Sequence, residues 1–108
     1  GKPRSFAEQE FERSIATFTW AAEEAARFCG ELIPMDGMAR GKGYEGHTLR
    51  WPIGIIFGIT PFNFPLNLVA HKVAPALACG NAIIIKPASN TPISALIMAR
   101  IASESGAP

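Results

Sequence analysis

The sequence is short of net charge and of long apolar runs, and both shortages exclude classes of protein. Its formal net charge is +1 over 108 residues, so no basic field is available to attract nucleic acid or an anionic membrane surface. No apolar run reaches the roughly 20 residues that a membrane-spanning helix needs. The polar, mixed-charge residues 1–12 do not resemble a signal peptide. We therefore predict neither a nucleic-acid partner nor a membrane partner.

Metal and cysteine chemistry have equally little support. Cys29 and Cys79 lie far apart at the ends of apolar patterns, which is typical of reduced, mostly buried thiols in a cytosolic protein. His47 and His71 are isolated, and no histidine or carboxylate pair has metal-binding or acid–base spacing. The sequence contains no Walker loop, and no GxGxxG fingerprint follows the first strand of the strand–helix–strand pattern. We expect no metal site and a cytoplasmic location.

The composition is otherwise that of a globular protein, with 48% hydrophobic and 18% charged residues. The length suffices for one modest domain. The chain begins without an initiator methionine and stops at Ser105-Gly106-Ala107-Pro108, a helix end that normally leads into another strand. We therefore expect these residues to be part of a longer chain.

The first half of the sequence predicts a long helix, a loop and a strand. Ser5 begins a capping-box pattern and Gly30 supplies a left-handed stop, so a helix is expected over residues 6–29. Residues 31–43 are expected to form a loop, and residues 44–51 a strand. The helix carries an apolar stripe that is expected to pack on a larger body: Phe11, Ile15, Phe18, Ala22, Ala25 and Cys29.

The second half alternates strands and helices. Residues 53–60 and 82–86 are apolar runs, typical of strands buried on both faces of a parallel sheet. A helix beginning at Pro65 separates them. Pro75 is expected to kink or split this helix, and Gly80 to end it. Its buried stripe is expected to be Leu66, Val69, Val73 and Leu77.

A last helix completes the pattern. Thr91 is expected to cap it, Pro92 to occupy its first position and Gly106 to end it. The strand–helix–strand–helix order predicts an α/β fold with a parallel crossover. We divide the chain into residues 1–52, an N-terminal helix, loop and strand, and residues 53–108, an incomplete βαβα unit. The residues of the last helix expected to face inward are Ile93, Leu96, Ile97 and Ile101.

Polar residues follow both strands of the predicted sheet. Asn63 comes after the first strand and Lys86 ends the second, and ligands of open parallel sheets bind beyond these carboxyl ends. Lys86 is either a lysine that reaches solvent from a strand end or a donor to ribose hydroxyls or phosphate. Asn63 is either a turn or capping asparagine or an amide donor to a developing oxyanion, which is worth roughly 3 kcal/mol. The residues alone leave both choices open.

These residues are part of longer motifs that resemble the aldehyde dehydrogenase superfamily. The likeness runs from about residue 50 to residue 108 and is weaker in the first helix. That family has an atypical Rossmann fold, which accounts for the missing glycine fingerprint. The motifs are Pro52-Ile53-Gly54-Ile55-Ile56, Ile59-Thr60-Pro61-Phe62-Asn63-Phe64-Pro65, Lys72-Val73-Ala74-Pro75-Ala76-Leu77-Ala78-Cys79-Gly80-Asn81, Ile84-Ile85-Lys86-Pro87-Ala88-Ser89 and Thr91-Pro92.

The resemblance implies an oxidoreductase that converts an aldehyde to a carboxylic acid with NAD or NADP, through a cysteine thioester that a glutamate helps to hydrolyse. Asn63 matches the family's oxyanion-binding asparagine, and Lys86 its ribose-binding lysine. The nucleophile and the glutamate belong to later parts of the family's chain. Cys29 and Cys79 lie outside the nucleophile motif, so this chain is expected to be catalytically silent alone. The cofactor-lining positions are matched by Ile59, Thr60, Pro61, Phe62, Asn63, Lys86, Pro87, Ala88 and Ser89.

Two positions depart from many members of the family. Ser89 stands where many have a glutamate that binds both ribose hydroxyls of NAD and repels the 2′-phosphate of NADP, so the serine permits NADP. Phe62 stands where many have tryptophan. Both departures are similar to the branch that acts on lactaldehyde or, without phosphorylation, on glyceraldehyde 3-phosphate. Serine at this position is also found in members acting on succinate semialdehyde.

Other functions stay open at this point. One alternative is a non-catalytic remnant that binds nucleotide or assembles subunits. Another is a reductase of the same superfamily that acts on an acyl-CoA or acyl phosphate. Residues 44–51 resemble a part of the family that contributes to subunit assembly, so the parent protein is expected to be a homo-oligomer that acts on a small-molecule aldehyde.

Overall fold

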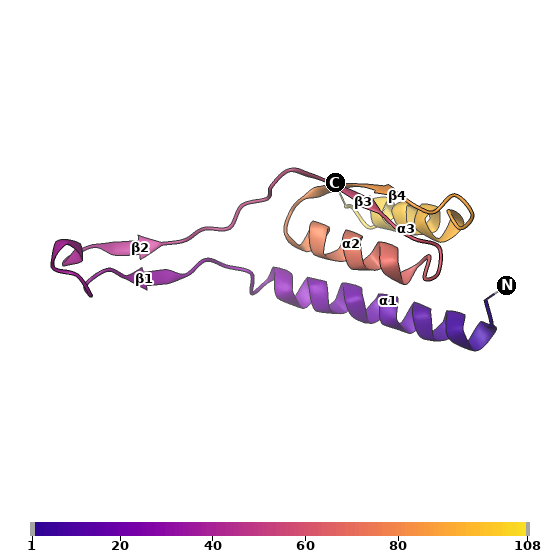
Figure 1. Ribbon diagram of the computed structural model, residues 1–108, viewed down its shortest axis with the longest axis horizontal. Helices are drawn as coiled ribbons and strands as arrows, with labels where there is room; N and C mark the ends of the chain where they lie inside the picture. Colours follow the sequence, from indigo (N-terminus) through magenta and orange to yellow (C-terminus); the bar gives the residue numbers. More distant parts are fainter. Residues whose placement is uncertain (1, 108) are drawn as a thin grey trace.

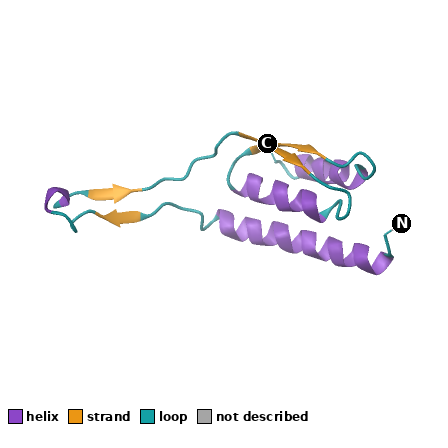
Figure 2. Cartoon of the chain, in the orientation of Figure 1, coloured by secondary structure: helices purple, strands orange, loops and turns teal. Residues whose placement is uncertain are grey.

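The computed structural model describes residues 2–107 and has an α/β fold, as predicted. Figures 1 and 2 show its helices gathered beside a small sheet and a second pair of strands extending to one side. The elements in chain order are α1 (Arg4–Ala25), β1 (Leu32–Pro34), the 3-10 helix η1 (Ala39–Gly41), β2 (Glu45–His47), β3 (Ile55–Ile59), α2 (Asn67–Ala78), β4 (Ala82–Lys86) and α3 (Ile93–Glu104).

β3 and β4 form a two-stranded parallel sheet and are joined through α2, as the strand–helix–strand order predicts. The register pairs Ile55 with Ala82 and Ile59 with Lys86. β4 has its predicted bounds. β3 is shorter than the predicted residues 53–60, because Gly54 has a φ of 109° and turns the chain just before the strand.

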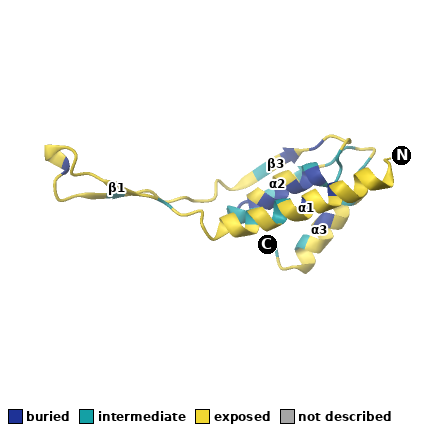
Figure 3. Ribbon diagram, turned by 90° about the horizontal axis from the view of Figure 1, so that it is seen from below, coloured by how far each residue is buried: buried dark blue, intermediate teal, exposed yellow. Residues whose placement is uncertain are grey.

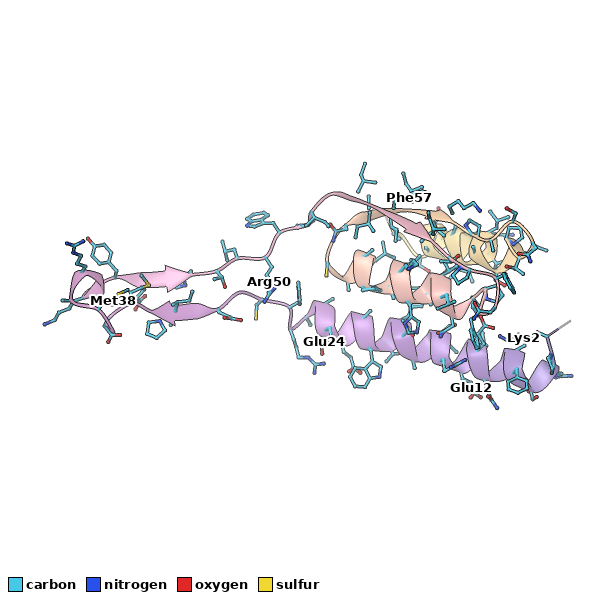
Figure 4. All side chains as sticks on the ribbon, in the orientation of Figure 1. Lys2, Glu12, Glu24, Met38, Arg50 and Phe57 are labelled. Carbon is cyan, nitrogen blue, oxygen red and sulfur yellow. The ribbon has the colours of Figure 1, made fainter. Side chains whose placement is uncertain are left out.

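The hydrophobic core lies on one face of this sheet, where α2 and α3 pack against β4 (Figure 3). On the other face Ile55 is 72% exposed and Phe57 is 63% exposed, and Phe57 points away from the helices (Figure 4). The prediction that both strands are buried on both faces is therefore wrong for residues 2–107, whose helices all lie on one side of the sheet. The buried core residues are Val69, Ala70, Val73, Ala95 and Met98.

α1 packs along α2 through a face that is largely polar. Its buried residues are Glu10 and Ser14, and Phe18 is the member of the predicted apolar stripe that packs against the core. Phe11 is 57% exposed and Ile15 is 52% exposed, so the prediction that the whole stripe forms the contact is wrong. The polar face is buried instead, because Glu10 and Ser14 make hydrogen bonds with the first residues of α2.

The ends of α1 also differ from the prediction. The helix begins before Ser5, and its N-cap residue, Pro3, has no side-chain capping bond. Glu8, the expected second member of the capping box, accepts a hydrogen bond from Arg4 Nε at 2.7 Å instead. The helix ends well before Gly30, which has no left-handed backbone.

β1 and β2 form an antiparallel hairpin arm that extends away from the helices (Figure 1). The loop predicted over residues 31–43 thus contains a strand, and the strand predicted over residues 44–51 is reduced to β2. The arm raises the radius of gyration to 18.9 Å, against about 13 Å for a compact chain of this length. Gly30 lies at its base, where a Cβ would be 1.6 Å from the Thr48 carbonyl oxygen. Close approach of two backbones therefore explains this glycine.

α2 runs as one helix through Pro75. Of the two predicted effects of this proline, a kink or a split, the split is therefore wrong. Pro75 lacks the N–H that would bond to the His71 carbonyl four residues back, so the helix continues with one backbone bond fewer. The predicted end at Gly80 is confirmed by its φ of 71°. Gly80 N–H donates to the Leu77 carbonyl and Asn81 N–H to the Ala76 carbonyl, both at 2.9 Å, which is a Schellman motif. The core receives the predicted stripe, Leu66, Val69, Val73 and Leu77.

Gly106, with a φ of 84°, stops α3 just after Glu104 as predicted, but the start and the inward face of the helix differ from the prediction. Pro92 is the N-cap residue rather than the first helical residue. Thr91 does not cap the helix, and its hydroxyl oxygen is buried without a hydrogen-bond partner among the described residues. The buried residues are Ala95 and Met98, so the helix is rotated from the predicted orientation. The residues wrongly predicted to face inward are exposed: Ile93, Leu96, Ile97 and Ile101.

Replacing Gly80 by alanine is expected to lower the free energy of unfolding by about 1 kcal/mol, because a side chain is strained in the left-handed region. The added Cβ would also lie 3.2 Å from Pro52 Cγ. The matched control is Gly37→Ala, since a Cβ at Gly37 meets nothing within 4 Å. Urea unfolding followed by circular dichroism measures the stability of both variants. Equal unfolding midpoints for Gly80→Ala and Gly37→Ala would contradict the prediction.

Candidate functional site

The carboxyl ends of β3 and β4 meet at one edge of the sheet. The register pairs Ile59 with Lys86, and Thr60 N–H continues the ladder by donating to the Lys86 carbonyl at 3.2 Å. The turn that contains Asn63 follows directly, and the segment from Pro87 to Ser89 leaves the same edge. The two polar segments singled out in the sequence therefore lie on the same edge of one sheet.

The side chains at this edge differ in their access to solvent. Ile59 is 62% exposed and Phe62 is 61% exposed, which leaves apolar surface beside the strand ends. Thr60 is buried at 4% exposure. Pro87 and Ala88 are half-buried. The remaining site residues are exposed: Pro61, Asn63, Lys86 and Ser89.

This donor set fits a dinucleotide cofactor. An ammonium at Lys86 and a hydroxyl at Ser89 are suitable partners for ribose and phosphate oxygens, and the exposed side chains of Ile59 and Phe62 offer flat apolar contact. The amide of Asn63 has N–H donors that suit a carbonyl oxygen. Each of these groups reaches the surface at the strand ends, where a ligand of an open parallel sheet binds.

The first turn of α2 is capped from another helix. Glu10 of α1 places one carboxylate oxygen, Oε1, where it accepts hydrogen bonds from Leu66 N–H at 2.8 Å and from Asn67 N–H at 3.0 Å. Backbone N–H groups at a helix start have no partner within the helix, and a negative charge there is favoured by the helix dipole. The N-cap residue of α2, Leu66, supplies no side-chain bond of its own. The Glu10 side chain therefore caps the N-terminus of α2.

A lysine joins this carboxylate to the turn of Asn63. Lys2 Nζ pairs with the other carboxylate oxygen of Glu10 and donates to the Asn63 carbonyl at 3.4 Å. Its ammonium also lies 4.2 Å from the centre of the Phe64 ring, and the guanidinium of Arg13 lies 5.0 Å from the same ring. Cations at these distances are attracted to an aromatic face, so Phe64 is held between α1 and the turn.

Ser14 extends the same polar contact along α1. Its hydroxyl donates to the Glu10 carbonyl at 2.9 Å and lies 3.5 Å from Asn67 Oδ1. Asn67 is 7% exposed and Ser14 is 4% exposed. The interface between α1 and α2 thus contains three buried polar residues, Glu10, Ser14 and Asn67, with the exposed Lys2 at its edge. These four residues are called here the α1–α2 polar cluster.

Glu10 remains charged in this setting. Burial by itself raises the pKa of its carboxyl, but the hydrogen bonds from Lys2 and from the N–H groups of Asn67 and Leu66 outweigh burial and hold the pKa below its usual value. A lowered folded-state pKa stabilises the fold above the ordinary value of 4.5. That stabilisation is lost as the pH falls through the lowered pKa.

Sequence reasoning missed the α1–α2 polar cluster. Glu10 and Ser14 are spaced i, i+4, with Phe18 one turn further on the same face, so a polar stripe beside the apolar one was visible in the helix. Apolar periodicity alone does not reveal such a polar stripe. Asn67 carries no local signal, because its contacts with Glu10 and Ser14 join residues more than fifty positions apart. The contact of Lys2 with the Asn63 carbonyl is equally distant in the sequence.

Residues 2–107 show neither a candidate metal site nor a membrane-spanning helix. Across residues 2–107, no group of three or more histidine, cysteine or carboxylate side chains is placed to hold a metal ion. Within the same range, no helix is long and apolar enough to cross a membrane.

Curated relatives match most of the chain. The 3-sulfolactaldehyde dehydrogenase of Priestia megaterium is 44% identical over 92% of this chain, and the lactaldehyde dehydrogenase of Methanocaldococcus jannaschii is 46% identical over 94%. The mitochondrial succinate-semialdehyde dehydrogenase of the mouse is 39% identical over 100%. The chain covers 21%, 20% and 20% of these three proteins, about a fifth of their length.

Solved structures agree with the fold. Aldehyde dehydrogenase 21 of Physcomitrella patens, in complex with succinate, is 54% identical with a TM-score of 0.89, over 94% of this chain and 21% of that one. The glyceraldehyde-3-phosphate dehydrogenase GapN of Methanocaldococcus jannaschii, complexed with NADP, is 42% identical with a TM-score of 0.82, over 96% of this chain and 22% of that one.

The family model described as the aldehyde dehydrogenase family matches residues 1–108. This match covers the α1–α2 polar cluster as well as the carboxyl edge of the sheet. With the motif order, the parallel β3–β4 unit and the similar solved structures all in agreement, the chain belongs to the aldehyde dehydrogenase family.

Proposed function

We propose that this chain is part of an oxidoreductase that oxidises a small aldehyde to a carboxylic acid with NAD or NADP. The observation that carries the proposal is the meeting of the Asn63 turn and Lys86 at the carboxyl edge of adjacent parallel strands. Relatives that match 94% and 100% of the chain are named as an aldehyde dehydrogenase and a semialdehyde dehydrogenase, which supports the reaction class.

In this proposal the chain supplies binding groups and one catalytic group. Lys86 and Ser89 hold the ribose end of the cofactor, while Ile59, Thr60, Pro61, Phe62, Pro87 and Ala88 form the surface on which it lies. When bound, the nicotinamide accepts a hydride. The Asn63 amide donates to the carbonyl oxygen of the substrate and stabilises the charge that develops there. The nucleophilic cysteine and the general-base glutamate are expected elsewhere in the full-length protein.

The substrate class follows from the branch that the chain resembles. Relatives are named for 3-sulfolactaldehyde, lactaldehyde and succinate semialdehyde, and one similar structure contains succinate. We propose a short aldehyde bearing a hydroxyl or an acidic group, and a panel of these three compounds is the first assay. A reductase that uses an acyl-CoA or acyl phosphate is the alternative, and turnover of those compounds alone would favour it.

A second role, in subunit assembly, is favoured by the hairpin arm. β1 and β2 project away from the helices, and Leu32, Met38 and Tyr44 on the arm are 62%, 69% and 70% exposed. We propose that residues 1–52 serve assembly of a homo-oligomer and that residues 53–108 serve cofactor binding. Mass measurement of the full-length protein tests the first part: a monomer would contradict it.

We also propose the cytoplasm as the location of the protein. Cys29 and Cys79 are both free thiols, which is usual in reducing compartments. The mouse relative is named as mitochondrial, so fractionation of cells that express the tagged full-length protein is the test.

Replacing Asn63 by alanine in the full-length protein is expected to lower kcat by roughly 100- to 1000-fold, because one oxyanion donor typically contributes that much. The KM for the cofactor is expected to change little, since the amide acts on the reacting oxygen. Steady-state formation of NADH or NADPH measures both. The control is Asn90→Ala, an exposed asparagine in the turn before α3. A kcat retained in Asn63→Ala would rule out the catalytic role of this residue.

Replacing Ser89 by glutamate is expected to lower kcat/KM for NADP by at least about tenfold, because the new carboxylate repels a 2′-phosphate. The kcat/KM for NAD is expected to hold or rise, since a carboxylate binds two ribose hydroxyls well. Ser103→Glu adds the same charge at an exposed position near the far end of α3 and serves as the control. An equal loss with both cofactors would contradict the assignment of Ser89.

A further inference from the structure

We propose that Glu10 is a positioning residue for Asn63: its carboxylate, carried by α1, fixes the first turn of α2 and with it the turn from which the Asn63 amide projects. The inference rests on the proposed oxyanion role of Asn63. It concerns a residue on a helix that holds none of the groups assigned to the cofactor.

The first step is the tie between Glu10 and α2. Leu66 N–H and Asn67 N–H both donate to one oxygen of the Glu10 carboxylate, at 2.8 and 3.0 Å. Two donors on one acceptor fix both the position and the direction of the helix start. Because the N-cap residue of α2 adds no side-chain bond, this carboxylate sets where the helix begins.

The second step is the short distance along the chain from that tie to Asn63. Phe64 and Pro65 separate Asn63 from Leu66, and the proline ring fixes its own φ. The Phe64 ring lies against Lys2 and Arg13, at 4.2 and 5.0 Å. Little freedom is left between the capped turn and Asn63.

The third step closes the segment from the other side. Lys2 pairs with Glu10 and also donates to the Asn63 carbonyl at 3.4 Å. The Lys2–Glu10 ion pair, with Lys2 just before α1 and Glu10 on it, therefore bonds the segment at both ends, at the carbonyl of Asn63 and at the N–H groups of Leu66 and Asn67. With its backbone held at both ends, Asn63 has a fixed Cα–Cβ direction, which limits where the amide can reach.

Burial suggests that this ion pair serves orientation more than stability. Glu10 is 3% exposed, and taking a charge out of water is unfavourable unless partners compensate for it. Well-packed apolar residues often stabilise a helix interface as well as a buried ion pair does. A carboxylate adds what an apolar residue lacks, which is directional bonding to particular backbone groups.

The test is a double-mutant cycle in the full-length protein, with the succinate semialdehyde assay or whichever aldehyde of the panel is turned over. Glu10→Gln keeps the size of the side chain and removes its charge. It is expected to lower kcat by roughly 5- to 30-fold, since a small misplacement of a catalytic group has effects of this order, while the KM for the cofactor stays nearly constant. Combined with Asn63→Ala, the Glu10→Gln change is expected to have no further effect on kcat, because the group that it positions is gone.

The matched control is Glu12→Gln. Glu12 is exposed on the same helix and lies on the side of α1 away from α2 (Figure 4), so its loss is expected to leave kcat unchanged. An unchanged kcat in Glu10→Gln would overturn the inference. So would a loss of kcat that is equally large with and without Asn63, because that result describes a general structural defect.

The cycle also separates this inference from the proposed function. If Asn63→Ala retains kcat, the oxyanion role itself fails. If Asn63→Ala loses kcat while Glu10→Gln does not, only the positioning role fails. Should Glu10→Gln not fold, hydrogen exchange on the wild-type protein decides: the N–H groups of Leu66 and Asn67 are expected to exchange slowly, and exchange at the rate of free amides would overturn the tie to Glu10.

Discussion

Parallel pairing of β3 with β4 determines where the other elements of the sheet unit lie. Parallel strands cannot be joined by a tight turn, so the chain returns through α2, and α2 in turn gives α1 its packing surface. The same pairing brings the residues after Ile59 and after Lys86 to one edge. The geometry of the candidate site is therefore a consequence of strand direction, and the side chains at the edge add the chemistry.

The helices of this chain make two kinds of contact, one polar and one apolar. α1 meets α2 through the α1–α2 polar cluster, in which direction matters because each bond joins particular atoms. α2 and α3 meet the sheet through apolar packing, which excludes water without selecting atoms. The apolar residues of α1 and α3 that are left over line a groove of about 820 Å³, with Phe11, Ile15, Ile97 and Ile101 among its residues. The α1–α2 polar cluster thus orients the two helices, while the apolar faces of α2 and α3 bury the core.

Local chemistry explains which parts of the fold were predictable. β4, and the helix ends at Gly80 and Gly106, depend on residues within a few positions, and their predictions are confirmed. Which face of α1 or α3 is buried depends on the elements that pack against it. Apolar periodicity therefore predicted the wrong residues to be buried, such as Ile97 in α3. The sheet edge that carries Asn63 and Lys86 followed from strand order. Glu10 was missed because the N–H groups that it caps, those of Leu66 and Asn67, lie more than fifty residues away.

The base of the hairpin arm has a consequence for how this region can vary. Gly30 and Thr48 approach so closely that no side chain fits at Gly30, and Thr48 N–H donates to the Glu31 carbonyl at 2.9 Å. The two backbones are locked where they leave the body of the molecule. At the opposite end, around the exposed Gly37, an added side chain meets nothing, and loop tips tolerate insertions. The tip of the arm therefore has room for added residues, while the close approach at Gly30 fixes the direction in which the arm leaves the helices.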